Sequence, residues 1–377
     1  GVGERGWISH ILEGEWVAGP ESVDDATLAA TMVDWRRKIR EHRFANEDYW
    51  RSRLPDFSRI NTPLLSAGNW GGQGLHLRGN IEGFVNAAAK HKKLRVHTGS
   101  HFHPFHAEEG RIDQLRWFDY WLKGIDTGLM EEPPVKLEIR TGGSTERYPF
   151  RSENEWPLAR TQWTKFHLNI ERAASDKKDA IEGSLVPALA KTVAKATYPG
   201  AAATRPGKAP RGISFVTPPL EHDTEVTGPI ILKLWVSSSS EDMDIFATIR
   251  NIDAEGKDVC EIGQQEDEIA CVTKGWLRAS HRKLDQEKST PHRPYHAHDE
   301  HQWLKPDEVV ECDVEIWPTS MVFRKGHKIR LDIGPVDGIA SLYFSHFHAD
   351  YNQGALNSVY SGGDKESYLL LPIIPPK

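Results

Sequence analysis

The sequence contains few cysteines, no long apolar run and no excess of positive charge. Its 377 residues include three cysteines (Cys260, Cys271 and Cys312), and none belongs to a C-x-x-C pair. The count predicts neither a disulfide framework nor a zinc knuckle, and we interpret the three as buried thiols in a reducing compartment. No window approaches eighteen consecutive apolar residues, so no membrane-spanning helix is expected. The net charge of −7 argues against nucleic acid as the main partner.

The N-terminal residues also lack the pattern of a signal peptide. The chain begins with Gly1, and the stretch GVGERGWISHILEGEW has no charged, apolar and small-residue succession. We therefore expect that the sequence begins inside a longer protein whose own N-terminus lies upstream. We also expect a cytoplasmic location, no cofactor and no membrane partner. Assembly into a homo-oligomer is left open.

Residues 1–52 are expected to contain a helical cap segment. Ser22 suits an N-cap and is followed by acidic residues, whereas basic residues follow Arg36, as a helix dipole favours. Apolar residues recur at helical spacing and make one apolar stripe, which contains Leu28, Met32, Trp35 and Ile39.

Residues 53–130 alternate between strand and helix patterns. The order is strand Leu64–Ala67, a glycine-rich turn at Gly68–Gly74, a helix over about Asn80–His91, strand Leu94–His97 and a helix over Ile112–Lys123. The first helix places Ile81, Phe84, Val85 and Ala88 on one face, and the second is expected to present Leu115, Phe118 and Leu122 to a core. This alternation is typical of a parallel α/β sheet. Two strands do not make such a sheet alone, so the remaining strands are expected upstream of Gly1.

Residues 131–377 lose the helical period and predict a β sandwich or jelly roll. Between about Ala174 and Pro210 the chain is rich in Ala, Lys, Gly and Pro, and we expect a long surface excursion there. The predicted strands are short and separated by turn residues: Val135–Arg140, Gln162–Leu168, Ile213–Val216, Ile230–Ser237, Ile245–Ile252, Val310–Ile316 and Lys328–Ile333.

The stretch Leu94–Gly110 carries the strongest functional pattern. An apolar strand runs into a loop with four histidines, His97, His101, His103 and His106. A histidine placed after a strand suits the general base of a Ser-His-acid hydrolase, which takes the serine proton and returns it to the leaving group. The G-x-S-x-G elbow that would carry the serine is absent from the whole sequence.

A zinc site is the alternative for the same loop. His101, His103 and His106 form H-x-H-x-x-H, whose imidazoles can converge on Zn²⁺. Related zinc loops place an aspartate before the last histidine, where this chain has Phe105. A second histidine-rich segment at His292–His301 is also compatible with metal binding. A solvated or interdomain surface is the more ordinary interpretation of such a segment. A chain without a nucleophile is equally compatible with a non-catalytic binding module.

The C-terminal half resembles a known family. The runs at Thr227–Lys257 and Trp276–Ile333 are similar to the C-terminal domain of the CocE/NonD hydrolases, the family of cocaine esterase and X-prolyl dipeptidyl-peptidase. The stretches Ser58–Phe84 and Arg116–Gly128 resemble the end of that family's catalytic domain. The resemblance implies an α/β-hydrolase core, an inserted helical cap and a C-terminal jelly roll. It also implies a serine hydrolase that acts on small-molecule esters, amides or X-Pro peptides.

The resemblance assigns the general base to His101, with His103 as the second choice. It places the nucleophilic serine and the oxyanion hole upstream of Gly1, in an N-terminal remainder of the same hydrolase. The family's acid follows the tryptophan of a G-W-x-D turn, but Trp70 is followed here by Gly71-Gly72-Gln73. Four residues are therefore candidates to orient the imidazole, three of them carboxylates that could replace the acid: Glu82, Glu108, Glu109 and Gln73.

Overall fold

The computed structural model describes residues 26, 30, 33–143, 147–170, 181–200, 212–264, 269–337, 352 and 354–376. The start of the helix predicted at Ser22 lies outside these residues, and the helix is interrupted: residues 26 and 30 are helical, residues 33 and 34 are not, and a separate helix, α3 (Trp35–Glu41), follows. Asp34 caps α3 by accepting the backbone N–H of Arg37 at 2.9 Å. The other helices are α4 (Asp48–Arg51), α5 (Leu77–Asn86), α6 (His103–His106) and α7 (Glu108–Lys123), with 3-10 turns η1 (Phe57–Arg59), η2 (Leu129–Glu131) and η3 (Ala279–His281).

A four-stranded sheet has the order β1 (Leu64–Asn69), β2 (Lys92–His97), β3 (Val135–Glu138) and β4 (Phe150–Glu153). The first three strands are parallel and β4 is antiparallel. Both strands predicted between residues 53 and 130 are thus confirmed. The sheet also contains two strands from beyond residue 130, and the division of the chain into three domains stays a prediction.

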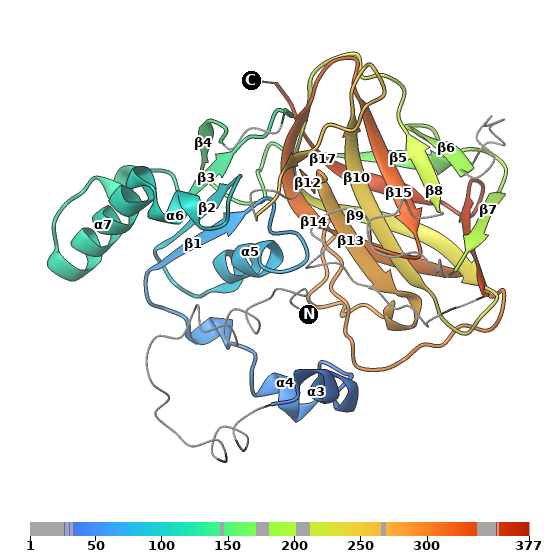
Figure 1. Cartoon of the computed structure of the whole chain (residues 1–377), viewed down its shortest axis with the longest axis horizontal. Helices are drawn as coiled ribbons and strands as arrows, with labels where there is room; N and C mark the ends of the chain where they lie inside the picture. The colour runs from blue at the N-terminus through green and yellow to red at the C-terminus, as the bar shows by residue number, and fades with distance from the viewer. Residues whose placement is uncertain are drawn as a thin grey trace.

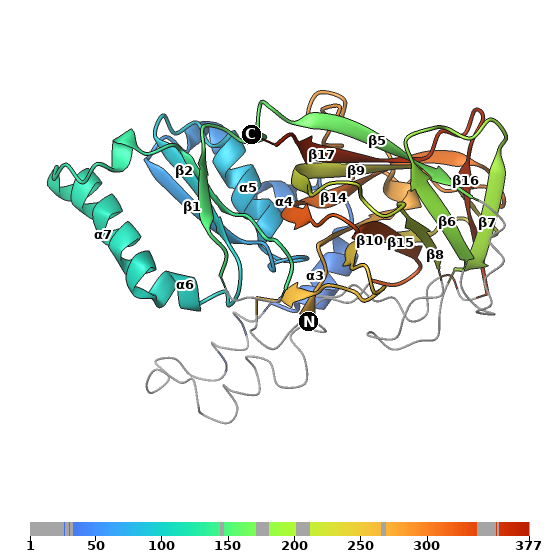
Figure 2. The same cartoon turned by 90° about the horizontal axis from the view of Figure 1, so that it is seen from above.

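Helix α5 covers one face of this sheet. Leu77, Ile81 and Phe84 recur at helical spacing and pack with Leu94 and Val96 of β2 in one buried cluster. The helix begins and ends earlier than predicted, and Val85, predicted on the same face as Ile81 and Phe84, is 37% exposed. In Figure 2, α5 lies between the small sheet and the large one, and α7 lies on the opposite side of the small sheet.

An eleven-stranded sheet makes up most of the remaining chain (Figure 1). Its neighbouring strands run in the order β14-β13-β10-β15-β8-β6-β5-β17-β9-β16-β7, and an additional pairing between β14 and β9 closes it on itself. The strands are β5 (Gln162–Asn169), β6 (Ile181–Val186), β7 (Ala194–Pro199), β8 (Ile213–Val216), β9 (Thr224–Ser238), β10 (Asp244–Ile252), β13 (Thr273–Arg278), β14 (Val310–Phe323), β15 (Lys328–Gly334), β16 (Leu356–Ser361) and β17 (Tyr368–Ile374), beside a separate pair, β11 (Glu261–Ile262) and β12 (Ile269–Ala270).

The two sheets share a buried boundary. The register of β14 against β9 shifts between Ile316 and Thr319, where Pro318 has no N–H to donate to a ladder. Trp317, at this shift, packs into the α5 cluster rather than into the core of the large sheet. Polar groups also cross the boundary, since the buried Arg140 guanidinium donates to the carbonyls of Ser320 and Val272 at 2.9 Å each. These contacts fix the small sheet against the large one.

Two predictions about surfaces were wrong. The segment from about Ala174 to Pro210 contains β6 and β7, so its described part is not an irregular excursion. The sequence did not reveal these strands because few of their residues are apolar and buried: Leu185 in β6, and Ala196 and Tyr198 in β7. On α7, Leu115, Phe118 and Leu122 are 57%, 54% and 77% exposed instead of buried. Among the described residues, no helix is both long and apolar enough to cross a membrane.

Candidate active site

The histidine loop begins where the parallel strands end. Asn69 of β1 lies opposite His97 of β2 in the strand register, and the backbone N–H of Trp70 donates to the carbonyl of His97 at 2.8 Å. The carboxyl ends of parallel strands are the edge at which α/β proteins place their ligands and catalytic groups. The loop and the glycine-rich turn after β1 therefore meet at that edge.

The backbone of the loop is held on both sides of Ser100. The buried Asn69 amide donates to the carbonyl of Gly99 at 2.8 Å, and its oxygen accepts the N–H of Gly71 at 2.7 Å. The N–H of His101 donates to the carbonyl of Gln264, from the β11–β12 connection, at 2.8 Å. One contact comes from the small sheet and the other from the β-rich part of the chain. Both fix backbone atoms close to the His101 ring.

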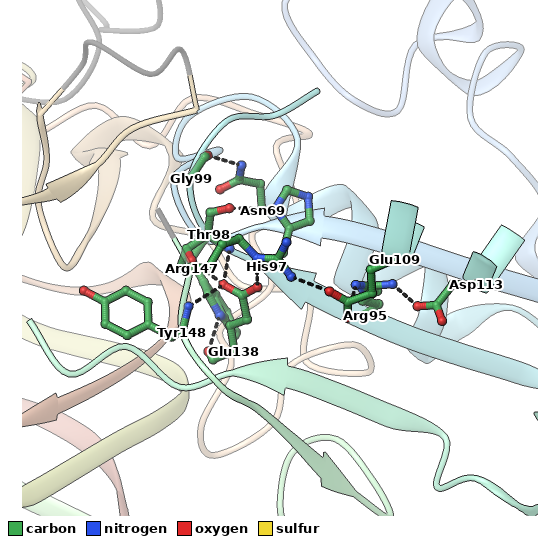
Figure 3. A network of polar contacts seen from close by, with 11 residues as sticks. Asn69, Arg95, His97, Thr98, Gly99, Glu109, Asp113, Glu138, Arg147 and Tyr148 are labelled. Carbon is green, nitrogen blue, oxygen red and sulfur yellow. Dashed lines mark hydrogen bonds and ion pairs between the residues drawn. The ribbon is translucent and has the colours of Figure 1, made fainter. Parts of the chain in front are cut away.

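A third contact comes from Glu138 at the end of β3. Its carboxylate accepts the backbone N–H of Thr98 at 3.0 Å and also the Thr98 hydroxyl. It accepts the backbone N–H of Tyr148 at 3.3 Å and the Arg147 Nε–H at 2.8 Å as well. Figure 3 shows these groups converging on Glu138, which is fully buried. The loop is thus fixed at the first residue after β2.

The His101 imidazole is partly buried and stacks on His76, with ring centroids 5.2 Å apart. Burial lowers its pKa below the ordinary value, and the neighbouring His76 adds to the effect. Its Nδ1 is buried and has no hydrogen-bond partner among the described residues. At neutral pH the ring is therefore uncharged and can accept a proton, and the orphaned nitrogen is the position at which a hydrolase acid would bind.

Two hollows meet at His101. A cavity of about 490 Å³ lies between one face of β1 and β2 and helices α6 and α7, and its lining includes Arg95, His97 and Phe118. A second, more open hollow runs beside β1 and α5, and its lining includes Ser66 and Gly83. His101 lines both. Its ring is thus reachable from the face of the sheet and from the side of β1.

The other loop histidines have different surroundings. His97 is buried, its Nδ1 lies 3.0 Å from the Thr98 carbonyl, and burial lowers its pKa to about 4. His103 and His106 are exposed on α6. Within the part of the chain that the structure describes, no group of three or more His, Cys, Asp or Glu is arranged to hold a metal ion. The geometry does not support the zinc alternative at His101, His103 and His106.

None of the four candidates to orient His101 is shown bonded to it. Glu82 pairs with Arg293, and Glu108 is exposed. Glu109 pairs with two arginines, Arg95 and Arg147.

Gln73, the fourth candidate, has both atoms of its side-chain amide in hydrogen bonds at the boundary between the sheets. Its amide nitrogen donates to the carbonyls of Cys271 and Val272 at 2.9 and 3.1 Å, and its oxygen accepts from the Cys271 thiol at 3.1 Å. The glutamine in the glycine-rich turn therefore anchors that turn to the β-rich part of the chain. The orienting role predicted for it is not what its contacts provide.

The second histidine-rich segment packs against Phe44 and Ala45. His281 and His298 lie with their Nδ1 atoms 3.1 Å apart, and Phe44 contacts the rings of His281 and His301. The backbone N–H of Ala45 donates to the carbonyl of His298 at 2.7 Å. This agrees with the interdomain-surface interpretation rather than with a metal tract.

Sequence reasoning missed the two residues that hold the loop, Asn69 and Glu138. Asn69 stands directly before Trp70, at the end of a strand, where a short amide commonly caps a turn. Glu138 is the only carboxylate in its predicted strand, and alternation with Val135 and Leu137 assigns it, with Lys136, to the face opposite these apolar residues. The strand pattern therefore did not indicate a buried, bonded carboxylate.

Comparison with known proteins relates the chain to a family. A family model described as the C-terminal non-catalytic domain of X-Pro dipeptidyl-peptidase matches residues 127–370. The solved structure of a CocE/NonD family hydrolase from Staphylococcus aureus superposes with a TM-score of 0.82 and 30% identity, covering 93% of this chain and 60% of that one.

Two curated relatives point the same way. The cocaine esterase of a Rhodococcus species is 24% identical over 416 residues, covering 95% of this chain and 65% of its own length. A Mycobacterium tuberculosis protein named as a serine esterase is 26% identical over 280 residues, covering 70% of this chain and 41% of its own. The chain spans less than two thirds of the length of each of these proteins.

Proposed function

Because the chain belongs to the CocE/NonD hydrolases, we propose that it is part of a serine hydrolase whose general base is His101. The observation that carries the proposal is the placement of His101. Its ring is uncharged and borders two hollows at the carboxyl edge of a parallel sheet, and three contacts fix the backbone around it. The imidazole would take the proton of a serine hydroxyl as that oxygen attacks an ester or amide carbonyl, then give it to the leaving group.

The serine is proposed to come from the remainder of the same hydrolase. Among the described strands, β1 pairs only with β2, so its other edge is available to a further parallel strand. The hollow along that edge reaches His101. Polypeptide that pairs with β1 would bring its own carboxyl end beside the imidazole, which is where a nucleophile elbow belongs.

The exposed apolar face of α7 supports the same proposal. Leu115, Phe118 and Leu122 lie on one side of the helix, and Phe105 is exposed close by on α6. Contiguous apolar surface of this kind usually marks an interface. We propose that the remaining α/β-hydrolase core covers it, with residues up to 52 forming part of a helical cap.

The β-rich part is proposed to be a jelly roll that supports the site without supplying a reacting group. The matched family is itself described as non-catalytic. Gln264 contributes a backbone carbonyl to the N–H of His101, which is a structural contact. The acyl group and leaving group of the substrate are not specified by these residues, so esters, amides and X-Pro peptides are the proposed class.

The test uses the complete hydrolase that contains this sequence, with a fluorophosphonate probe and an aryl ester. His101→Ala is expected to lower ester hydrolysis by about 10³-fold or more and to abolish serine labelling, because the serine loses its base. His103→Ala, on the exposed turn two residues later, is the matched control and should retain activity. Full labelling of His101→Ala, or loss of activity in His103→Ala alone, would contradict the assignment.

A further inference from the structure

The buried carboxylate of Glu138 has more partners than a structural ion pair needs. Both oxygens are used: one accepts Arg147 Nε–H, and the other accepts two backbone N–H groups and a hydroxyl. A fully buried carboxylate is costly unless its lone pairs are all satisfied, so this arrangement has one well-defined geometry. The residue that it holds most closely is Thr98, three positions before His101.

The bonds of Glu138 continue to the far side of the loop. Arg147 also pairs with Glu109 at 3.0 Å, Glu109 pairs with Arg95 at 3.1 Å, and Arg95 bonds to Asp113. Glu109 and Asp113 belong to α7, the helix that follows the loop. In Figure 3 the network runs as one chain from Thr98 to Asp113. It therefore ties together the residue that enters the histidine loop and the helix that leaves it.

The strands explain why Glu138 is the residue that does this. Val96 of β2 lies opposite Leu137 of β3 in a parallel register, so Glu138 lies beside the end of β2. Thr98 is the first residue after the His97 end of that strand, where the backbone leaves the sheet, and its N–H donates to the Glu138 carboxylate at 3.0 Å. A carboxylate at this position supplies the acceptor that a further strand residue would have supplied.

We propose that Glu138 is the positioning residue of His101: it acts through the Thr98 backbone and sets where the imidazole stands relative to the serine. The inference rests on the function proposed above. Its bonds to the Thr98 backbone and hydroxyl act on the loop that carries His101, so a kinetic effect is expected beyond its contribution to stability. A general base displaced by about 1 Å loses about 100-fold in rate, whereas substrate binding is hardly altered.

The experiment compares Glu138→Gln with the wild type in the complete hydrolase. Glutamine keeps the shape and one acceptor oxygen, but its amide group places N–H donors against Arg147 or Thr98. We expect kcat to fall by about 10- to 100-fold with KM changed by less than about 3-fold, because the loss falls on the base and not on binding. The rate of fluorophosphonate labelling should fall in parallel. Glu153→Gln, at a buried carboxylate that pairs with Arg151 and Arg160 beside Val135, at the other end of β3, is the control and should keep kcat within about 3-fold.

Thr98→Val provides a second variant that tests the same contact without a change at Glu138. It removes the hydroxyl that Glu138 accepts and keeps the backbone N–H and the side-chain shape. Its kcat should also fall with KM retained, and the loss in the double variant should be smaller than the product of the two single losses, because both act through one contact.

Three results overturn the inference or its basis. Wild-type kcat in a folded Glu138→Gln protein removes the positioning role and leaves the role of His101 intact. Independent, multiplicative losses for Glu138→Gln and Thr98→Val also contradict a shared contact. Retained activity in His101→Ala removes the proposed function itself, so the two failures are told apart by separate variants.

Discussion

The two halves of the histidine loop differ in what determines their conformation. Residues 98–101 are held by Glu138, Asn69 and the Gln264 carbonyl, all within this chain. Residues 102–106 and helix α7 instead present Phe102, Phe105 and Phe118 at 62%, 54% and 54% exposure. The backbone of the first half is fixed by contacts within this chain, and the second half has an apolar face that burial against further protein would stabilise.

This difference separates two tasks. Positioning the base requires fixed hydrogen bonds of definite geometry, and those come from polar residues at strand ends. Covering α7 requires only apolar area, which any complementary surface can provide. Substitutions in the first half should therefore alter the loop in every form of the protein. Substitutions on the exposed apolar face of the second half should matter only where the rest of the hydrolase is present.

Asn69→Ala should have the largest effect of the remaining tests. It leaves the Gly99 carbonyl and the Gly71 N–H unpaired in a buried site, which should cost about 2–4 kcal/mol of unfolding free energy. Displacement of the loop should lower kcat by about 100-fold. Denaturant unfolding and ester hydrolysis measure the two effects. Asn86→Ala, on the exposed end of α5, should cost less than about 0.5 kcal/mol, and an equal loss in both variants would remove the special role of Asn69.

Phe118→Asp should separate the covered from the uncovered state of α7. In the 377-residue chain the side chain is 54% exposed, so the change should cost less than about 1 kcal/mol. In the complete hydrolase the same aspartate would be buried against the proposed core, at a cost of about 2–4 kcal/mol.

Trp117→Ala is the matched control on the same helix, because Trp117 is 7% exposed in this chain. It should destabilise both forms by about 3 kcal/mol or more. Equal effects of Phe118→Asp in the two forms would show that α7 stays uncovered, and the contrast between the two halves of the loop would disappear.

How far the sequence predicted the molecule follows the same division. Periodicity located β1, β2 and most strands of the large sheet, because each has an apolar pattern that local composition reveals. It also predicted the face of α7 correctly as apolar, but not its exposure, since burial depends on neighbours outside the pattern. His101 came from a resemblance and its surroundings are consistent with that role. Asn69 and Glu138 were missed because their role depends on contacts with residues 30 and 40 positions away in the chain.

The smallest expected effect is a shift in the pH profile of the reaction. This profile reports on His101, so it tests only the first half of the loop. Protonated His101 cannot accept the serine proton, so kcat/KM should fall as the pH decreases through the pKa of His101. Burial, with a contribution from His76, lowers that pKa, and the acid limb should therefore lie below the ordinary histidine value of 6.5. His76→Gln removes the neighbouring imidazole and should move the limb upward by a fraction of a pH unit, toward 6.5, without altering KM. A limb above 6.5 in the wild type would mean that a carboxylate outside the described residues binds Nδ1, because an anion there stabilises the protonated ring. In that case the pKa of His101 would be set by that carboxylate, and not by the contacts that position the loop.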